Sequence, residues 1–343
     1  MTAAPLKSAS KIRERPQALL FGFLIMLLVL LTGLSLFVGR LGLGGLSELL
    51  NLRSSDSETF WILILEIRLP RTILAGAVGA TLGLSGAVLQ GLLRNPLAEP
   101  FILGASSSAA LGAVIVFYFG IAAGNALATP LGGVAGAMVA TAVLLALGGR
   151  TQEPLTLILA GVAINALTAA LTSLALNLAP SPYAALEIVF WILGSFADRS
   201  MDHVAFALPL MALGWCLLLS TWRSLDALIL GEDIAASLGF NLIGVKIRAV
   251  LGCAFAVGAA VATTGVISFV GLIIPHILRP LVGYRPGQLL PASMLGGAVL
   301  MLAADIGVRM IDTQFELKIG VLTALIGTPF FFHLLFVLRR GGS

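Results

Sequence analysis

The sequence predicts an all-α polytopic membrane protein with about ten transmembrane helices. Only 10% of its 343 residues are charged, whereas soluble domains carry about 25%. Hydrophobic residues make up 59% of the chain and the mean hydropathy is +1.06, so there is too little polar surface to cover it in water. Apolar windows of about 20 residues, each long enough to cross a bilayer as a helix, recur along the sequence.

Uncharged windows mark the expected spans. They fall near residues 18–38, 72–93, 101–121, 126–147, 155–178, 204–221, 249–274, 287–304 and 319–338. The first follows a basic segment and is too long for the apolar core of a signal peptide, so we expect a retained span. This pattern predicts a tail over 1–17 and one membrane domain over 18–340.

The window at 249–274 is expected to cross twice or to re-enter. Basic loops flank it on both sides, and Lys and Arg concentrate in cytoplasmic loops. Both loops can lie inside only if the segment breaks, and Thr263-Thr264-Gly265 is the natural position. Pro275 then makes the second piece short and irregular. The break raises the expected number of spans to about ten and places both termini in the cytoplasm.

The charge distribution agrees with this topology. Thirteen basic and six acidic residues fall on the inner face, which gives +7, and seven basic and ten acidic residues fall on the outer face, which gives −3. The asymmetry has the sign expected for a membrane protein. The pI near 9.4 therefore needs no nucleic acid to explain it.

The stretch from Arg68 to Gly104 organises the chain. It opens with Arg68 and Arg71, and the 22 residues from Thr72 to Leu93 have no charged side chain. At 1.5 Å per residue this run spans roughly 33 Å, about the thickness of a bilayer's hydrocarbon core. A polar turn follows at residues 94–100.

Two connections are more than simple loops. Residues 183–196, on the outside, are apolar but short, which indicates an interfacial or re-entrant helix. The inner segment 231–245 has helical spacing at Ile234 and Leu238, and Gly239 is its expected stop. A structured, partly apolar cytoplasmic loop favours a docking surface.

No constellation of catalytic or metal-binding residues is present in the sequence. There is no phosphate-binding G-x-x-x-x-G-K-[ST] loop, so the chain is not expected to hydrolyse ATP itself. His203, His276 and His333 lack ligand spacing, and we favour hydrogen-bonded interface histidines over haem-iron ligands. The chain is therefore expected to bind no cofactor.

The expected span centres contain no acid or base. Charges inside a bilayer usually mark ion pathways, so their absence argues against ion coupling and for an external energy source. Asp305 lies near the outer end of its span, where Arg309 is a local partner.

The polar residues Gln90, Asn165, Thr168 and Thr172 have two interpretations, helix–helix hydrogen bonds or the lining of a wet pathway. The last three share one face of a helix.

Arg68, Arg71 and Arg309 fall near the outer face. They are either solvated arginines among lipid headgroups or charges that meet acidic groups on a partner. Exposed pairs of this kind contribute about 0.2–1 kcal/mol each, so their effect would be on orientation and encounter rate.

Long segments of the chain resemble the FecCD-type permeases, the membrane subunits of ABC importers for iron-siderophores, haem and cobalamin. The matching segments are RLPR, SGAVLQGLLRNPLAEPFILG, GVISFVGLIIPHILRPLVG, LLPASMLGGAVLMLAAD with Arg309, and ELKIGVLTALIGTPFFFHLL. Together they cover nearly the whole chain from about Glu66 onward.

The resemblance implies a type II ABC importer permease fold. It implies a homodimer in the bacterial inner membrane, two ATP-binding cassette subunits that hold ATP and Mg²⁺, and a periplasmic substrate-binding protein. Arg68, Arg71 and Arg309 would engage acids of the binding protein, and Asn95 and Leu97 would form a cytoplasmic gate.

The cytoplasmic loop at about 223–248 would contain the coupling helix that sits in the ATPase. Its family motif falls on Gly231, Glu232, Ala235, Leu238 and Gly239.

The substrate implied is a metal chelate, either iron-siderophore or haem, with cobalamin as the alternative. Residues 160–167, AGVAINAL, are similar to haem permeases of the family. The chain departs from the family at Lys318, where proline is usual, and at Ser268, where glycine is usual. An ion-coupled secondary carrier and a membrane-bound enzyme are the competing functions, disfavoured by the absence of midplane carboxylates and of clustered histidines or acids.

Overall fold

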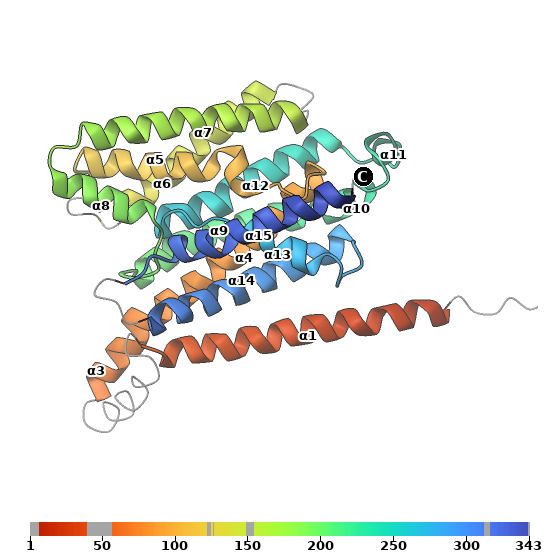
Figure 1. Ribbon diagram of the computed structural model, residues 1–343, viewed down its shortest axis with the longest axis horizontal. Helices are drawn as coiled ribbons and strands as arrows, with labels where there is room; N and C mark the ends of the chain where they lie inside the picture. Colours follow the sequence, from red (N-terminus) through yellow and green to blue (C-terminus); the bar gives the residue numbers. More distant parts are fainter. Residues whose placement is uncertain are drawn as a thin grey trace, which may run out of the picture.

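The computed structural model describes residues 7–39, 57–121, 125, 127–148, 154–311 and 316–341. These residues form a bundle of helices of unequal length (Figure 1). The long helices are α1 (Lys7–Phe37), α4 (Leu69–Leu92), α6 (Ala128–Gly148), α7 (Pro154–Asn177), α9 (Met201–Leu219), α12 (Leu242–Thr264), α14 (Pro286–Met310) and α15 (Ile319–Gly341). The shorter ones are α3 (Ser57–Ile62), the π-helical turn η1 (Leu63–Arg68), the 3₁₀ turn η2 (Pro100–Leu103), α5 (Ala105–Tyr118), α8 (Pro182–Ile192), α10 (Trp222–Leu228), α11 (Glu232–Ser237) and α13 (Val270–Leu278).

The all-helical polytopic fold predicted from composition is confirmed. Among the described residues, seven helices are long and apolar enough to cross a membrane. The remaining predicted spans correspond to the shorter helices α5 and α13 and to α15. The connection expected at 183–196 contains the short helix α8, and the inner loop contains the short helix α11, as its spacing indicated.

The break predicted inside the window at 249–274 is confirmed. Helix α12 ends at Thr264, and Gly265 has a φ of +76°, a conformation that costs a glycine little. A Cβ at this position would lie 2.2 Å from the carbonyl oxygen of Trp191, so glycine is also required by space. The chain then starts the short helix α13 at Val270.

Helices α4 and α14 pack together at the centre of the bundle. A Cβ on Gly79 would lie 2.2 Å from the carbonyl oxygen of Gly297, and one on Gly297 would lie 2.1 Å from that of Gly79. The two backbones therefore touch directly, as small residues allow in membrane helices. Most of α4 is buried as a result.

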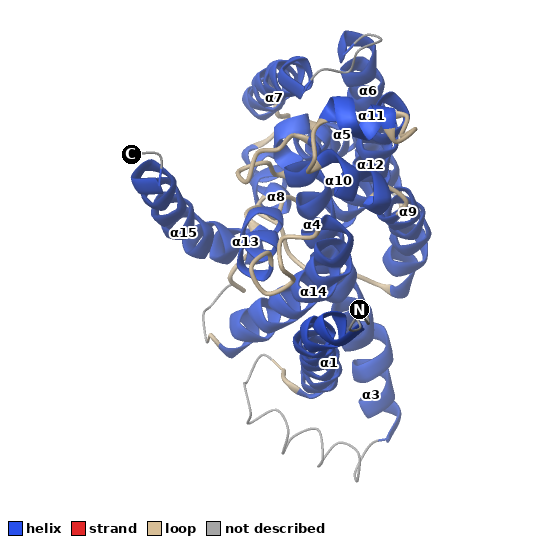
Figure 2. Cartoon of the chain, turned by 90° about the vertical axis from the view of Figure 1, so that its right-hand side faces the viewer, coloured by secondary structure: helices blue, strands red, loops and turns tan. Residues whose placement is uncertain are grey.

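The two ends of the bundle carry different elements. Helices α3 and α8 lie at one end, and α10 and α11 lie at the other, together with the start of α1 and the end of α15 (Figure 1). Helix α15 diverges from its neighbours along its length (Figure 2). These opposite ends hold the candidate sites.

Candidate functional site

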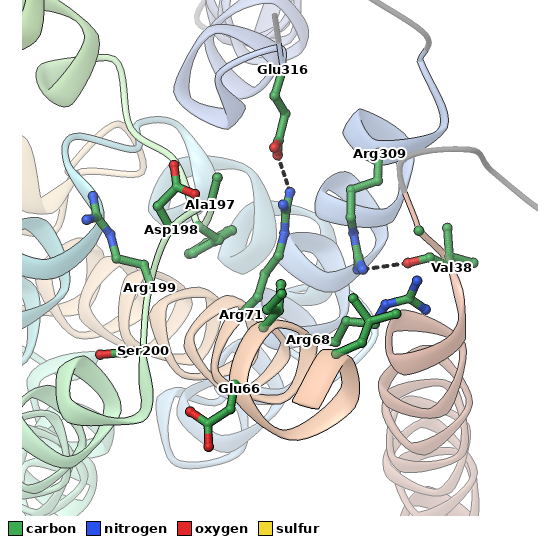
Figure 3. A pocket seen from close by; sticks show the side chains of 14 residues that line it. Val38, Glu66, Arg68, Arg71, Ala197, Asp198, Arg199, Ser200, Arg309 and Glu316 are labelled. Atoms are coloured by element: carbon green, nitrogen blue, oxygen red, sulfur yellow. Dashed lines mark hydrogen bonds and ion pairs between the residues drawn. The ribbon is translucent and has the colours of Figure 1, made fainter. Parts of the chain in front are cut away.

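The arginines predicted at the outer face do come together at the α3 end of the bundle. Arg68 ends η1, Arg71 lies in the first turn of α4 and Arg309 in the last turn of α14. All three line one pocket of about 460 Å³ (Figure 3). Of the two interpretations left open above, that of solvated arginines does not fit Arg68 and Arg309, which are buried.

Arg68 and Arg309 cap the end of α1. Arg68 donates from Nη1 to the carbonyl oxygens of Leu36 and Phe37, at 2.9 and 2.8 Å. Arg309 donates from Nη1 to those of Ser35 and Val38, both at 2.8 Å. The last carbonyls of a helix have no partner within it, and two arginines from other helices satisfy them here.

Asp305 joins Arg309 to Arg71. Its carboxylate lies 2.9 Å from Nη2 of Arg309, which is the local pairing expected from the i,i+4 spacing, and 2.8 Å from Nη2 of Arg71. Arg71 also pairs with Glu316, which precedes α15. The Arg71 and Glu316 side chains are 12% and 19% exposed, so this pair is the part of the cluster that solvent reaches.

Sequence reasoning missed a fourth arginine in this pocket. Arg199 lies on the loop between α8 and α9, on a different wall from Arg71 (Figure 3). Its Nε is buried and has no hydrogen-bond partner among the described residues. Burial lowers the pKa of its guanidinium, while the neighbouring Asp198 opposes that shift. No motif marked Arg199, because its position follows from the path of a loop.

The polar turn after α4 contains the two residues predicted as a gate. Asn95 accepts a hydrogen bond at its Oδ1 from the backbone N–H of Leu97, 2.9 Å away. Leu97 packs against a small apolar cluster, separate from the main core, that joins α13 to α15. The turn therefore lies where three segments meet.

The predicted coupling motif forms helix α11 and its two ends. Gly231 and Gly239 flank the helix with φ values of +119° and +87°. Ala235 is buried against the bundle, whereas Leu238 is 60% exposed. Glu232 lies 3.7 Å from Nζ of Lys246 on α12. The side chain of Leu238 is therefore exposed, while Ala235 and Glu232 attach α11 to the bundle.

Three of the four predicted pathway residues, Gln90, Asn165 and Thr168, make internal hydrogen bonds. Gln90 donates to the carbonyl oxygen of Gly271 at 3.2 Å and accepts from Nη2 of Arg279 at 2.6 Å, which ties α4 to the α13 segment. Asn165 donates to the carbonyl oxygen of Phe101 at 2.9 Å. Thr168 bonds back to its own helix, and Thr172 is half-buried on the same face of α7. Gln90 and Asn165 therefore hydrogen-bond to neighbouring segments, which is the first of the two interpretations given above.

A second pocket, of about 330 Å³, lies near the end of the bundle that carries α10. Gln90, Arg94 and Arg279 line it together with residues of α10 and the start of α14. Nη2 of Arg94 donates to the carbonyl oxygen of Leu228 at 3.0 Å, so this basic residue is also tied to a neighbouring helix.

Comparisons with known proteins place these features in a family. The FecCD transport family matches residues 26–337. The hemin transport system permease protein HmuU of Yersinia pestis is 38% identical over 339 residues, which cover 96% of this chain and 99% of that protein. The vitamin B12 import system permease protein BtuC of Vibrio vulnificus is 36% identical over 323 residues, covering 94% and 95%.

A solved structure has the same fold. It shows a metal-chelate type ABC transporter in an inward-facing conformation, and it matches with a TM-score of 0.80 at 35% sequence identity. The match covers 94% of this chain and 99% of that one.

Proposed function

Since the chain belongs to the FecCD transport family and is the multi-pass permease subunit of an ABC importer, we propose that it carries a metal chelate, an iron-siderophore or haem, from a binding protein into the cytoplasm. It would act as a homodimer in the bacterial plasma membrane with both termini cytoplasmic. Two separate ATPase subunits would bind ATP and Mg²⁺, and this chain would bind no cofactor.

The observation that carries the choice of substrate class is the end-to-end similarity to a hemin permease, together with the structural match to a metal-chelate type transporter. Cobalamin is the second candidate, because a vitamin B12 permease is similar over almost the same length. Haem and cobalamin are both metal ions chelated by a large ring of four nitrogen donors, so one passage of this fold could admit either.

The pairing of the buried acidic side chain in the spanning helices supports an external energy source for transport. Within the spanning helices that the structure describes, Asp305 is the buried acidic side chain, and two arginines hold it. A proton- or sodium-coupled carrier needs a carboxylate that can exchange its ion. An acid fixed between two guanidinium groups is poorly suited to that role.

We assign docking of the binding protein to one end of the bundle, and the gate and the ATPase contact to the other. The outer arginine pocket is the proposed docking site for the binding protein, with Arg71 as its most accessible member, and Arg68 and Arg309 positioned behind it. Asn95 and Leu97 would form the cytoplasmic gate. Helix α11 would insert Leu238 into the ATPase, with Gly231, Glu232, Ala235 and Gly239 shaping the helix around it.

Gln90, Asn165, Thr168 and Thr172 are the candidates for the lining of the passage. Their hydrogen bonds would then have to exchange as the helices move during transport.

Reconstitution tests the proposal. The permease, its ATPase and its binding protein would be assembled in proteoliposomes and offered haem, a ferric siderophore, cobalamin or molybdate, the last as an oxyanion outside the chelate class. We expect ATP-dependent uptake of haem or the ferric siderophore. Uptake of cobalamin alone would establish the second candidate, and uptake by the permease alone on an ion gradient would refute both.

A further inference from the structure

The start of α13 is held in an unusual way. Phe269, which precedes the helix, has a φ of +70°. Non-glycine residues seldom adopt this left-handed conformation, and a bulky side chain there is an outlier that surrounding structure must enforce. The question is therefore what holds Phe269 and what its side chain does.

Glu99 holds it from a distant part of the sequence. A carboxylate oxygen of Glu99 accepts a hydrogen bond from the backbone N–H of Phe269, 170 residues later. Glu99 lies in the connector between α4 and η2, two residues after Leu97. Burial raises the pKa of Glu99 to about 7, while the bond from Phe269 favours the charged form. Above that pH the bond places a negative group at the N-terminus of α13, where the helix dipole and the unpaired N–H favour one.

The side chain of Phe269 presses on α15. A Cβ placed on Gly327 would lie 2.2 Å from Cγ of Phe269, so the ring occupies the space that glycine leaves on that helix. Phe269 also belongs to the apolar cluster formed by Leu272, Ile273 and Leu334, which Leu97 and two phenylalanines of α15 join. The side chain of Phe269 therefore connects α13 and α15 with Leu97 of the turn at residues 95–98, which we call the gate turn.

Helix α15 borders a groove beside this contact. An open apolar groove of about 620 Å³ lies beside α15, next to the ends of α8 and α12, and α15 touches the chain there at Gly320, where a Cβ would lie 2.2 Å from the carbonyl oxygen of Leu193. Gly320, Ala324 and Thr328 of α15 line that groove. The divergence of α15 from the bundle is visible in Figure 2. The contacts at Gly320 and at Gly327 are therefore two close attachments of α15 to the bundle.

We propose that Glu99 and Phe269 form a latch for the gate turn. The Glu99 carboxylate holds Phe269 in its left-handed conformation, and the ring of Phe269 then locks α15 and Leu97 together. When the bond to Glu99 is lost, Phe269 relaxes to an ordinary conformation, its ring leaves Gly327, and the turn at residues 95–98 loosens. Glu99 is thus a positioning residue, and the inference rests on the gate proposed above.

A cysteine reporter in the turn can test the latch. Ala98 lies between Leu97 and Glu99 and is fully buried, so Ala98→Cys should be protected while the latch holds. The complete importer with its ATPase and binding protein would be used, with the exposed Cys216 replaced by serine. The readout is the rate at which a membrane-impermeant maleimide labels the reporter without nucleotide.

We expect Glu99→Ala to raise the labelling rate about tenfold, the effect of losing one charge-assisted hydrogen bond. Glu99→Gln keeps an acceptor oxygen, so its labelling rate should fall between those of the wild type and Glu99→Ala. Phe269→Gly, which removes the ring and accepts the positive φ, should raise labelling as much as Glu99→Ala. Glu187→Ala removes an exposed carboxylate on α8 and is the matched control, expected to leave the rate unchanged.

Unchanged labelling in Glu99→Ala and Phe269→Gly importers that still assemble would overturn the latch. If Glu99→Ala fails to assemble, Glu99→Gln and Phe269→Gly decide in the same way. Wild-type uptake separates this result from the proposed function, because a failed latch leaves ATP-driven uptake intact. Failure of the function would instead show as no uptake by the wild type.

Discussion

If the arginine pocket docks the binding protein as proposed, Glu316 is the residue that would compete most directly with that partner. It pairs with Arg71 and is partly exposed, so an incoming carboxylate must displace it. We predict that Glu316→Gln strengthens binding of the binding protein by about two- to fivefold, because a partly exposed ion pair is worth about 0.2–1 kcal/mol. Binding isotherms on nanodisc-embedded permease would measure it. Weaker binding would mean that Glu316 itself contacts the partner.

Asp305 stabilises the same region from behind. It is buried and contacts Arg71 and Arg309. Removing one partner of a buried pair leaves an uncompensated charge, so we predict that Asp305→Ala lowers the free energy of unfolding by about 3–5 kcal/mol.

Thermal unfolding in detergent would check the Asp305 prediction against Glu187→Ala, an exposed change expected to stay within about 0.5 kcal/mol. Equal stability of the two variants would contradict it.

At the scale of single residues, the sequence predicted which charged residues lie close together but not which atoms they contact. The i,i+4 spacing was enough to pair Asp305 with Arg309, and the motifs placed Arg68 near them. Arg68 and Arg309 also bond backbone carbonyls at the end of α1, more than 30 and 270 residues away, which the sequence did not predict. A charge-reversal variant at these two positions would therefore release the end of α1 as well as any docking surface.

Helix α4 and helix α14 supply a test at the scale of elements. The backbones touch at Gly79 and Gly297. We predict that Gly297→Ala destabilises the protein by about 1–3 kcal/mol, because the added methyl group must force the helices apart. Gly307→Ala on the same helix is the control, since a Cβ there meets nothing within 4 Å. Similar melting temperatures for the two variants would show that the crossing can adjust.

Helix α11 gives a prediction about coupling. Because Leu238 is largely exposed, Leu238→Ser should leave the stability of the isolated permease unchanged. In the full importer we predict at least a severalfold loss of uptake for each ATP hydrolysed, because an apolar anchor to the ATPase is removed. Leu281→Ser, an exposed change in the loop after α13, is the control. Normal coupling in Leu238→Ser would refute the role of α11.

Element boundaries were predictable where charge and apolar length determine them. The break at Thr264 followed from the basic loops on either side and from the glycine at 265. The left-handed Phe269 could not be predicted, because its conformation depends on Glu99, which is distant in the sequence. The direct contact of Gly79 with Gly297 likewise depends on how two helices cross.

At the scale of the whole molecule, the fold places the two proposed interaction sites at opposite ends of the bundle. The arginine pocket lies at the α3 end and α11 lies at the opposite end. Two segments run between these ends. Helix α4 carries Arg71 at one end and leads to the gate turn at the other, and α15 begins after Glu316 and reaches the apolar cluster that contains Leu97.

This arrangement suggests how docking could reach the gate. Displacement of Glu316 by a partner's carboxylate would release one contact at the start of α15, and the same helix meets Phe269 at Gly327. A contact at each end is the physical connection that coupling requires, and the latch variants test whether the inner contact can switch.

The energy source for transport is a property of the whole set of spanning helices, because it depends on which acidic side chains they bury. Asp305 is fixed between two arginines, and the described spanning helices offer no other buried acid that could exchange a proton or sodium ion. We therefore predict that uptake in proteoliposomes containing the full importer persists when ionophores collapse the proton and sodium gradients. Replacing ATP with a non-hydrolysable analogue should abolish it. Loss of uptake under ionophores while ATP hydrolysis continues would require an ion-binding site that these helices do not provide, and would return the secondary-carrier alternative.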